Sequence, residues 1–368
     1  MFYRLFFLLF FTPIFTSMAQ NPLEAELQQL LDRSVDHQKV FGTAFAIRTD
    51  SLSWQGASGN LTATQPYFIA STTKLFTTAL IFQLQAAGKL QLDDKIDQYL
   101  PAEVLQDLHV YKGKDYSGDI TISHLLAHRS GLPDYFQGKG PSSKSLEDEL
   151  VSGNDQSWTF EQAMERTKAM QPLFAPGSKG KAHYSDANFQ LLGRIIELVS
   201  GSTYAANCEQ HILVPLALGS TYLYQDPSDT RPKPLYYKQK ELHIPLAMAS
   251  FGPDGGMVST SADMLVFLEA FFTGKLFPAA YLADLQAWNR IFFPMQSGVG
   301  IHLFKLPWLM NPTGAVPSFM GHSGLSGALA YYSPQYKLYI AGTVNQVAHP
   351  DRSFKSMIKL VQRVKKHG

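Results

Sequence analysis

The sequence predicts an α+β fold in which one antiparallel sheet is flanked by helices and carries an inserted helical lobe. Strand patterns stand near both ends of the chain, in residues 40–59 and after Gly298, whereas helical patterns fill most of the middle. Strands so far apart can share one sheet if helices cover its faces, which is the simplest way to bury their apolar sides. We expect a single domain over residues 20–368, with the helical lobe at roughly residues 90–237.

The first 19 residues have the pattern of a cleavable signal peptide. Arg4 provides the positive start, residues 5–15 form a short apolar run, and residues 17–19 (Ser-Met-Ala) place small side chains where a signal peptidase cuts. A membrane anchor is the alternative, but this run is shorter than the roughly 20 residues of a spanning helix, and Pro13 interrupts it. We expect cleavage before Gln20, export to the periplasm or the medium, and no stable membrane span after cleavage.

The elements of the first quarter follow from periodicity and caps. A helix begins at Asn21-Pro22, a favourable cap and first position, and continues with apolar residues at helical spacing. Residues 40–59 predict two short strands joined by a turn at residues 49–51. A long helix from Ser71 to about Ala87 is apolar almost all round, so we expect it to be buried, and Gly88 ends it.

The later elements are predicted in the same way. Residues 137–158 are rich in Gly, Ser and charge and predict a long surface loop. A helix covers residues 188–199, and Thr260 with Asp263 predicts a capping box for another. A hairpin turns at residues 333–335, and a helix closes the chain at residues 351–366.

Composition and charge exclude several classes of protein. Hydrophobic residues make up 45% of the 368, charged residues 17%, and the formal net charge is +1, which is typical of a globular protein and gives no electrostatic basis for nucleic-acid binding. Cys208 is the single cysteine, so an internal disulfide is impossible. We interpret it as a small buried residue of a helix rather than as a thiol nucleophile.

Ser71 and Lys74 form the central chemical motif. They lie one helical turn apart, so their side chains share a face, and a serine at a helix start feels the positive end of the dipole. A nearby amine of lowered pKa can accept the hydroxyl proton, so this pair makes a nucleophile without histidine. The same spacing occurs at Ser178–Lys181, in a Pro-Gly loop, and at Ser356–Lys359, expected on the wet face of the last helix.

Five segments in the right order resemble the markers of the serine β-lactamase-related family, which includes class C β-lactamases, D,D-peptidases and penicillin-binding proteins. The resemblance runs from about residue 42 to 345 and implies the β-lactamase/transpeptidase-like fold. A match to one marker alone is weak evidence, but matches to five markers in the right order are specific to the family. The segments are residues 67–101 with Ser-Thr-Thr-Lys, 120–136 with HLLAHRSGL, 174–201 with Tyr-Ser-Asp, 252–276 with Gly-Gly, and 319–334 with His-Ser-Gly.

The resemblance implies a role for each matching residue. Ser71 would be the acylated nucleophile and Lys74 its proton partner. Tyr184 matches the tyrosine that works with the lysine and passes a proton to the leaving group. On its own, Tyr184 would be interpreted as a core aromatic residue with a satisfied hydroxyl.

The fifth marker, with His-Ser-Gly, implies the substrate-binding wall. His322 and Gly324 match the strand that lines the cleft, and the glycine lets substrate lie close to the backbone. The backbone N–H groups of Ser71 and Leu325 would form the oxyanion hole, a device worth about 10²–10³ in rate for each donor. Relatives with histidine at the position of His322 are more often D,D-peptidases and esterases than true β-lactamases.

Asp186 departs from the pattern, because many relatives have asparagine there. Asparagine can donate to a substrate carbonyl, whereas ionised aspartate can only accept. Three interpretations of Asp186 follow. It could bind a substrate with a free amine or hydroxyl, or it could do no more than bridge to Lys74. In the third, the side-chain amide of Asn188 would donate to the substrate carbonyl in its place. The change puts β-lactam hydrolysis in doubt.

No metal or organic cofactor is expected. His124 and His128 have the spacing of zinc ligands on a helix, but no Glu lies between them in the metalloprotease pattern, and the marker that contains them implies structural roles. No Gly-x-Ser-x-Gly elbow, phosphate loop or dinucleotide fingerprint is present.

The sequence therefore predicts an exported serine hydrolase that works through an acyl-enzyme on Ser71. The leading hypothesis is a D,D-carboxypeptidase, a D-amino-acid peptidase or an esterase of the penicillin-binding type. One alternative is a true β-lactamase, and another is a protein that binds penicillin or peptidoglycan fragments without turnover. The partner is a small molecule or peptide, including one derived from peptidoglycan, and not nucleic acid.

Overall fold

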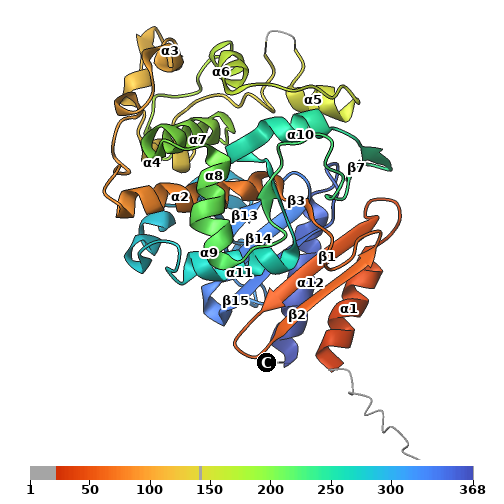
Figure 1. The fold of residues 1–368 in the computed structure, drawn as a ribbon. Coiled ribbons are helices and arrows are strands. Elements are labelled where there is room, and N and C mark those ends of the chain that lie inside the picture. The colour runs from red at the N-terminus through yellow and green to blue at the C-terminus, as the bar shows by residue number, and fades with distance from the viewer. Residues whose placement is uncertain (1–21, 141–142, 368) are drawn as a thin grey trace, which may run out of the picture.

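The computed structural model describes residues 22–140 and 143–367, so the predicted leader lies outside the described residues. In this part of the chain the main sheet has eight antiparallel strands in the order β10-β11-β12-β13-β14-β15-β1-β2. The pairing of β1 with β15 joins the N-terminal and C-terminal parts of the chain, with Ala46 opposite Ala341. This confirms the α+β fold with one antiparallel sheet built from both ends of the chain (Figure 1).

The strands of the main sheet are short and regular. The hairpins predicted at residues 49–51 and 333–335 are both confirmed, but the sheet also begins earlier than Gly298, with β10 and β11. The bounds are β1 (Gly42–Arg48), β2 (Ser53–Gly59), β10 (Asn289–Phe292), β11 (Met295–Ser297), β12 (His302–Phe304), β13 (Phe319–Ser323), β14 (Ala328–Ser333) and β15 (Leu338–Thr343).

Helices cover both faces of the sheet. On one face α1 (Pro22–Ser34) and α12 (Asp351–His367) pack together and enclose a core that contains Phe45, Phe319 and Leu360. On the other face α11 (Ser261–Phe272) lies across β15, β1 and β14. A larger core continues from there into the helical lobe (Figure 1).

The buried helix α2 (Lys74–Ala86) stands between the sheet and the lobe. All its residues from Lys74 to Phe82 are buried, as predicted from the apolar side chains on all sides of the helix. Gly88 follows the end of the helix with a φ of 68°. The prediction of one helix from Ser71 was wrong in its first turn. A 3₁₀ turn, η1 (Ala70–Thr73), precedes α2 and carries the serine.

The lobe is mostly helical, but it contains more elements than the sequence predicted. Residues 137–158 are not one loop, because Ser145 and Asp148 form a capping box that starts α5 and Leu146 and Leu150 bury its apolar side. The helices are α3 (Ala102–Leu105), α4 (Ile122–Leu126), α5 (Leu146–Val151), α6 (Phe160–Lys168), α7 (Ala187–Ser200), α8 (Tyr204–Cys208), α9 (Val214–Leu216) and α10 (Pro245–Phe251).

Small strands and single turns complete the structure. Three minor sheets pair β3 (Tyr67–Phe68) and β6 (Tyr222–Leu223) with β9 (Met257–Ser259), β4 (Val110–Tyr111) with β5 (Lys114–Asp115), and β7 (Leu235–Tyr237) with β8 (Lys240–Leu242). The turns are η2 (Ile96–Gln98), η3 (Ser117–Asp119), η4 (Glu209–Leu213), η5 (Gly252–Asp254), η6 (Ala279–Leu282), η7 (Asp284–Gln286), η8 (Trp308–Met310) and η9 (Pro334–Tyr336). Among the described residues no helix has the length and apolarity to cross a membrane.

Candidate active site

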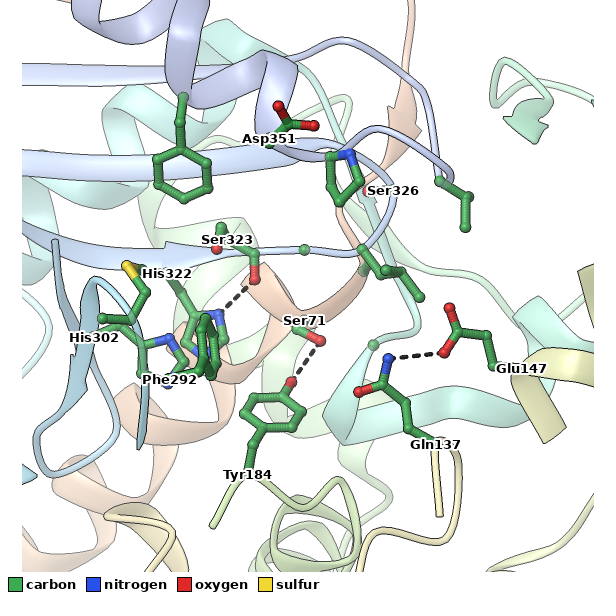
Figure 2. A pocket seen from close by; sticks show the side chains of 18 of the residues that line it. Ser71, Gln137, Glu147, Tyr184, Phe292, His302, His322, Ser323, Ser326 and Asp351 are labelled. Atoms are coloured by element: carbon green, nitrogen blue, oxygen red, sulfur yellow. Dashed lines mark hydrogen bonds between the residues drawn. The ribbon is translucent and has the colours of Figure 1, made fainter. Parts of the chain in front are cut away.

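Ser71 lies at the start of η1, where the chain turns from β3 into α2. The preceding residue, Ala70, has a φ of 45°, a left-handed conformation that is uncommon for a residue with a side chain and often marks a functional site. The first N–H groups of such a turn have no partner within the helix. Ser71 therefore presents both a hydroxyl and an N–H group at the wall of the cavity described below (Figure 2).

The Ser71 hydroxyl is bonded to Tyr184. The Tyr184 hydroxyl donates to Ser71 Oγ at 2.7 Å, from the loop that precedes α7. Burial, reinforced by the negative charge of Asp186, raises the pKa of Tyr184 well above its ordinary value. In the resting arrangement Tyr184 is thus a neutral phenol that acts as a donor.

Lys74 is fully buried and does not bond to Ser71. Its Nζ atom donates to Asp186 Oδ1 at 2.5 Å and to the backbone carbonyl of Asp254 at 2.6 Å. It also lies 5.1 Å from the centre of the Tyr184 ring, so its charge acts on the tyrosine across the ring face. Of the interpretations of Asp186, the bridge to Lys74 is the one that the structure shows.

Two further acids surround this ion pair, and the sequence analysis missed both. Burial and the charge of Asp186 raise the pKa of Asp134 to about 8 and that of Asp254 well above its ordinary range. Asp134 accepts from the Asp186 N–H at 3.1 Å, and Asp254 accepts from the Tyr135 hydroxyl at 2.7 Å. Burial thus favours the neutral form of both acids, which lie beside the Lys74–Asp186 ion pair.

The predicted substrate-binding wall also lies at the cavity. His322 is in β13, while Gly324 and Leu325 follow its end, and all three line the cavity with Ser71. A side chain at Gly324 would place its Cβ 2.5 Å from the Ile69 carbonyl oxygen and 3.1 Å from the Ser71 N. Glycine is thus required there for close contact between β13 and the serine turn.

Three buried imidazoles meet beside Tyr184, because β12 contributes His302, another residue that the sequence analysis missed. Nitrogens of His128, His302 and His322 lie within 4.8 Å of one another, and histidine is a common zinc ligand. However, Nδ1 of His128 accepts from the Ser185 N–H at 3.2 Å, so the neutral ring keeps its proton on Nε2, the nitrogen left for a metal. The rings of His302 and His322 stack with their centres 4.1 Å apart.

This histidine cluster forms an uncharged wall beside Tyr184. Burial lowers the pKa of His302 to about 3 and that of His322 well below its ordinary value, and the positive charge of Lys74 acts in the same direction. The Nδ1–H of His322 donates to the Ser323 carbonyl at 2.8 Å, which fixes the ring (Figure 2).

The cavity has a volume of about 690 Å³ and extends to both sides of Ser71. Figure 2 shows Ser71 and Tyr184 between Gln137 and Glu147 on one side and His302 and Phe292 on the other. We define the lobe-side compartment by Phe136, Leu150, Val151, Leu235, Leu242, Ile244, Met248 and Phe251. We define the sheet-edge compartment by Phe292, Phe293, Pro294, Met295, Phe304, Leu306, Met310, Phe354 and Ile358.

The other residues that the sequence analysis considered as functional candidates have different surroundings in the structure. Asn188 is buried and bonded to Ser130 at 2.6 Å, so its side chain does not replace an amide in the cavity. His124 closes the capping box of α4. Ser178 bonds to the carbonyl of Ala175, and Ser356 is buried in α12, contrary to the prediction of a wet face.

Comparisons with known proteins agree with this geometry. A family model described as "Beta-lactamase" matches residues 27–362. The chain is 26% identical over 357 residues to the "Putative D-alanyl-D-alanine carboxypeptidase" of Escherichia coli (strain K12), covering 87% of this chain and 77% of that protein. It is 25% identical over 314 residues to the "N-acetylmuramyl-L-alanine amidase" of Bacillus subtilis (strain 168), covering 77% and 68%.

Solved structures show the same fold. The D-stereospecific amidohydrolase from Streptomyces sp. superposes with a TM-score of 0.73 at 26% identity, over 90% of this chain and 98% of that one. The D-amino acid amidase from Ochrobactrum anthropi SV3, complexed with L-phenylalanine amide, has a TM-score of 0.78 at 20% identity, over 94% and 99%. Since the family model covers nearly the whole chain and the motif residues meet in one cavity, the chain belongs to the beta-lactamase family.

Proposed function

We propose that this serine hydrolase acts through an acyl-enzyme on Ser71, with α-amino-acyl amides or esters of apolar D-amino acids as substrates. Loss of one proton from the Tyr184–Lys74 pair creates the base that takes the Ser71 proton as Oγ attacks the carbonyl carbon. Tyr184 then gives that proton to the leaving atom when its bond to carbon breaks. Water releases the acyl group by the same steps in reverse.

The oxyanion that forms in each step needs donors that are already in place. The backbone N–H groups of Ser71 and Leu325 are the predicted pair, and both residues line the cavity. The close packing of Gly324 on the serine turn supports this assignment, since it holds the two backbones together. Such preorganised donors stabilise developing charge in a buried site.

The observation that carries the substrate class is the composition of the lobe-side compartment. Its walls are apolar, and two acidic side chains lie at the cavity near it: Asp186 is ion-paired with Lys74, whereas Glu147 accepts a hydrogen bond from the neutral amide of Gln137. An apolar side chain would fill this compartment, and the substrate's α-ammonium group would lie near the Glu147 carboxylate. The D configuration is proposed from the relatives, which include a D-stereospecific amidohydrolase at 26% identity.

A D,D-carboxypeptidase is the second candidate, and the 26% identity to the E. coli protein favours it. Such an enzyme binds a free carboxylate at the end of its peptide. Among the described residues that line the cavity, Lys355 is the one lysine or arginine, and it is ion-paired with Asp351 at 2.6 Å. The cavity thus offers an amine better electrostatic partners than a carboxylate.

The test compares three substrates with the purified mature protein. We expect D-phenylalanine p-nitroanilide to be hydrolysed with a kcat/KM at least about tenfold above that of its N-acetyl derivative, since acetylation removes the ammonium charge. We expect N-acyl-D-Ala-D-Ala to be slower than both, and Ser71→Ala to be inactive on all three. Equal rates with and without the acetyl group would reject the amine-binding part of the proposal.

A further inference from the structure

We propose that the sheet-edge compartment binds the leaving group, and that the preferred substrates therefore release an apolar alcohol or amine. This inference rests on the proposed acyl-enzyme function and adds to it the half of the substrate that departs first. The apolar lining of this compartment is suited to an alkyl or aryl group.

The position of Tyr184 decides which compartment receives the leaving group. Because Tyr184 returns the proton to the leaving atom, that atom must depart on the side of the cavity where the tyrosine lies. The Tyr184 ring is 6.1 Å from the ring of His302 and 6.5 Å from that of His322. His302 in turn contacts Phe292, also at 6.1 Å, which is the entrance of the sheet-edge compartment (Figure 2).

The compartment beyond Phe292 continues as an apolar surface. Phe304 of β12 stacks on Phe354 of α12 with ring centres 5.1 Å apart, so strand and helix form one continuous wall. The charged pair at its rim, Asp351 and Lys355, is neutralised by its own ion pair. A leaving group with a carboxylate would lose its hydration here without gaining a free cation, whereas an apolar group would only be removed from water.

Two side chains at the mouth of this compartment are unusually exposed for apolar residues. Phe293 is 71% exposed and Met310 is 59% exposed, yet both line the cavity. An alkyl group bound between them would bury their surface together with its own. Full burial of a methylene group improves binding by about three- to fourfold.

The experiment varies the leaving group alone. D-phenylalanine methyl, butyl, hexyl and octyl esters release n-alkanols of nearly constant basicity, so differences among them measure burial of the chain and not its chemistry. We expect kcat/KM to rise at least about tenfold from methyl to hexyl, which corresponds to partial burial of the added methylenes.

Variants at the mouth locate the effect. Met310→Ser and Phe293→Ser should each flatten this rise by at least about threefold, because they remove apolar contacts from the chain. Leu309→Ser is the matched control, since Leu309 is 82% exposed and adjacent to Met310 but does not line the cavity. It should keep the wild-type dependence on chain length.

The outcomes separate the two proposals. If none of the four esters is hydrolysed, or if Ser71→Ala hydrolyses them equally well, the acyl-enzyme function itself is wrong. If the methyl ester is hydrolysed but the rate does not rise with chain length, the leaving-group inference is overturned. The same holds if Leu309→Ser flattens the series as much as Met310→Ser. Thermal melts of the three variants establish that each is folded.

Discussion

Tyr184 and Lys74 share one buried environment but donate to different partners. Tyr184 is neutral and donates to Ser71, while Lys74 is held by Asp186 and by the Asp254 carbonyl. Removal of the Ser71 proton needs a base. The Tyr184–Lys74 pair becomes that base only after it has lost one proton. The side chain of Asp186 opposes that loss, because its negative charge raises the pKa of Tyr184.

The first prediction concerns Asp186→Asn. Removal of the negative charge lowers the pKa of Tyr184, so the rising limb of the kcat/KM profile should move to lower pH by about one unit. The measurement is hydrolysis of D-phenylalanine p-nitroanilide between pH 6 and pH 10, all on the rising limb because the pKa of Tyr184 is raised well above its ordinary value. A shift of one unit shows there as a roughly tenfold higher kcat/KM at each pH. Asp226→Asn, at an exposed site, is the control and should leave the limb in place. An unmoved limb in Asp186→Asn would show that Tyr184 is not the group that titrates.

The second prediction concerns Gly324→Ala. The new methyl group would approach the Ile69 carbonyl oxygen to 2.5 Å and the Ala70 Cβ to 2.8 Å, so β13 must move away from the serine turn. We expect kcat/KM to fall at least about tenfold, since displacement of an oxyanion donor is costly. Gly219→Ala, where a Cβ meets open space, should be neutral in the same assay. Full activity of Gly324→Ala would contradict the proposed oxyanion hole.

The sequence could predict the residues that occur in short motifs. Ser71, Lys74, Tyr184, Asp186 and His322 all come together as the markers implied, although Lys74 bonds to Asp186 instead of Ser71. Asp134 and Asp254 lie within two of the five marker segments, but the markers implied no role for them, and His302 lies outside all five segments. They reach the site through tertiary packing of separate elements, and a single buried acid or histidine has no pattern in the chain.

At the scale of elements, the Lys74–Asp186 pair ties three helical segments together. Lys74 begins α2, Asp186 precedes α7, and the Asp254 carbonyl belongs to η5. Asp134 joins the same cluster through the N–H group of Asp186. Protonation of this cluster is therefore coupled to the packing of the lobe on the sheet.

The third prediction is a pH dependence of stability. Asp134 has a pKa of about 8 in the folded protein, against an ordinary value of about 4 when unfolded. Between these values the folded chain holds a proton that the unfolded chain has released, so the free energy of unfolding falls as pH rises from about 4 to about 8. Asp134→Asn should weaken this fall because it removes the titrating group.

Thermal melts at pH 5 and pH 8 measure the effect. The difference in Tm between the two pH values should be smaller in Asp134→Asn than in the wild type. Asp226→Asn should keep the wild-type difference, because its site is exposed. An equal difference in Asp134→Asn would mean that Asp134 ionises normally in the folded state.

The predicted elements failed where local signals were short. The capping box of Ser145 and Asp148 was present in the sequence, but charge and glycine around it predicted a loop, and α5 spans only six residues. The first turn of the serine helix is 3₁₀ because the chain enters it from a left-handed Ala70 next to Gly324. That constraint comes from β13, far along the chain, and no local pattern reveals it.

At the scale of the whole molecule, the pairing of β1 with β15 was predictable because strand patterns were present at both ends of the chain. The two compartments of the cavity were not predictable from the sequence, because each combines segments that are remote in sequence. The sheet-edge compartment, for example, joins β12 to the start of α12. A local sequence pattern indicates whether a segment is a helix, a strand or a loop. It does not indicate which segments line the same cavity.

The fourth prediction concerns export, which we propose from the leader at residues 1–19. Expression of the full chain in a Gram-negative host should give a periplasmic protein whose first residue is Gln20, as determined by intact mass. The reason is the short apolar run followed by Ser-Met-Ala, which suits a signal peptidase. Recovery of a chain that starts at Met1 in the membrane fraction would support an anchor instead.

The central claim is that Ser71 is the nucleophile, and covalent labelling tests it most directly. The mature protein is treated with a fluorophosphonate and, separately, with a fluorescent penicillin, and the labelled peptide is identified by mass spectrometry. We predict one fluorophosphonate adduct per chain, on Ser71, and none in a folded Ser71→Ala variant. Penicillin labelling would in addition show that the cavity accepts a lactam. Equal labelling of Ser71→Ala, or an adduct on another serine, would contradict the account.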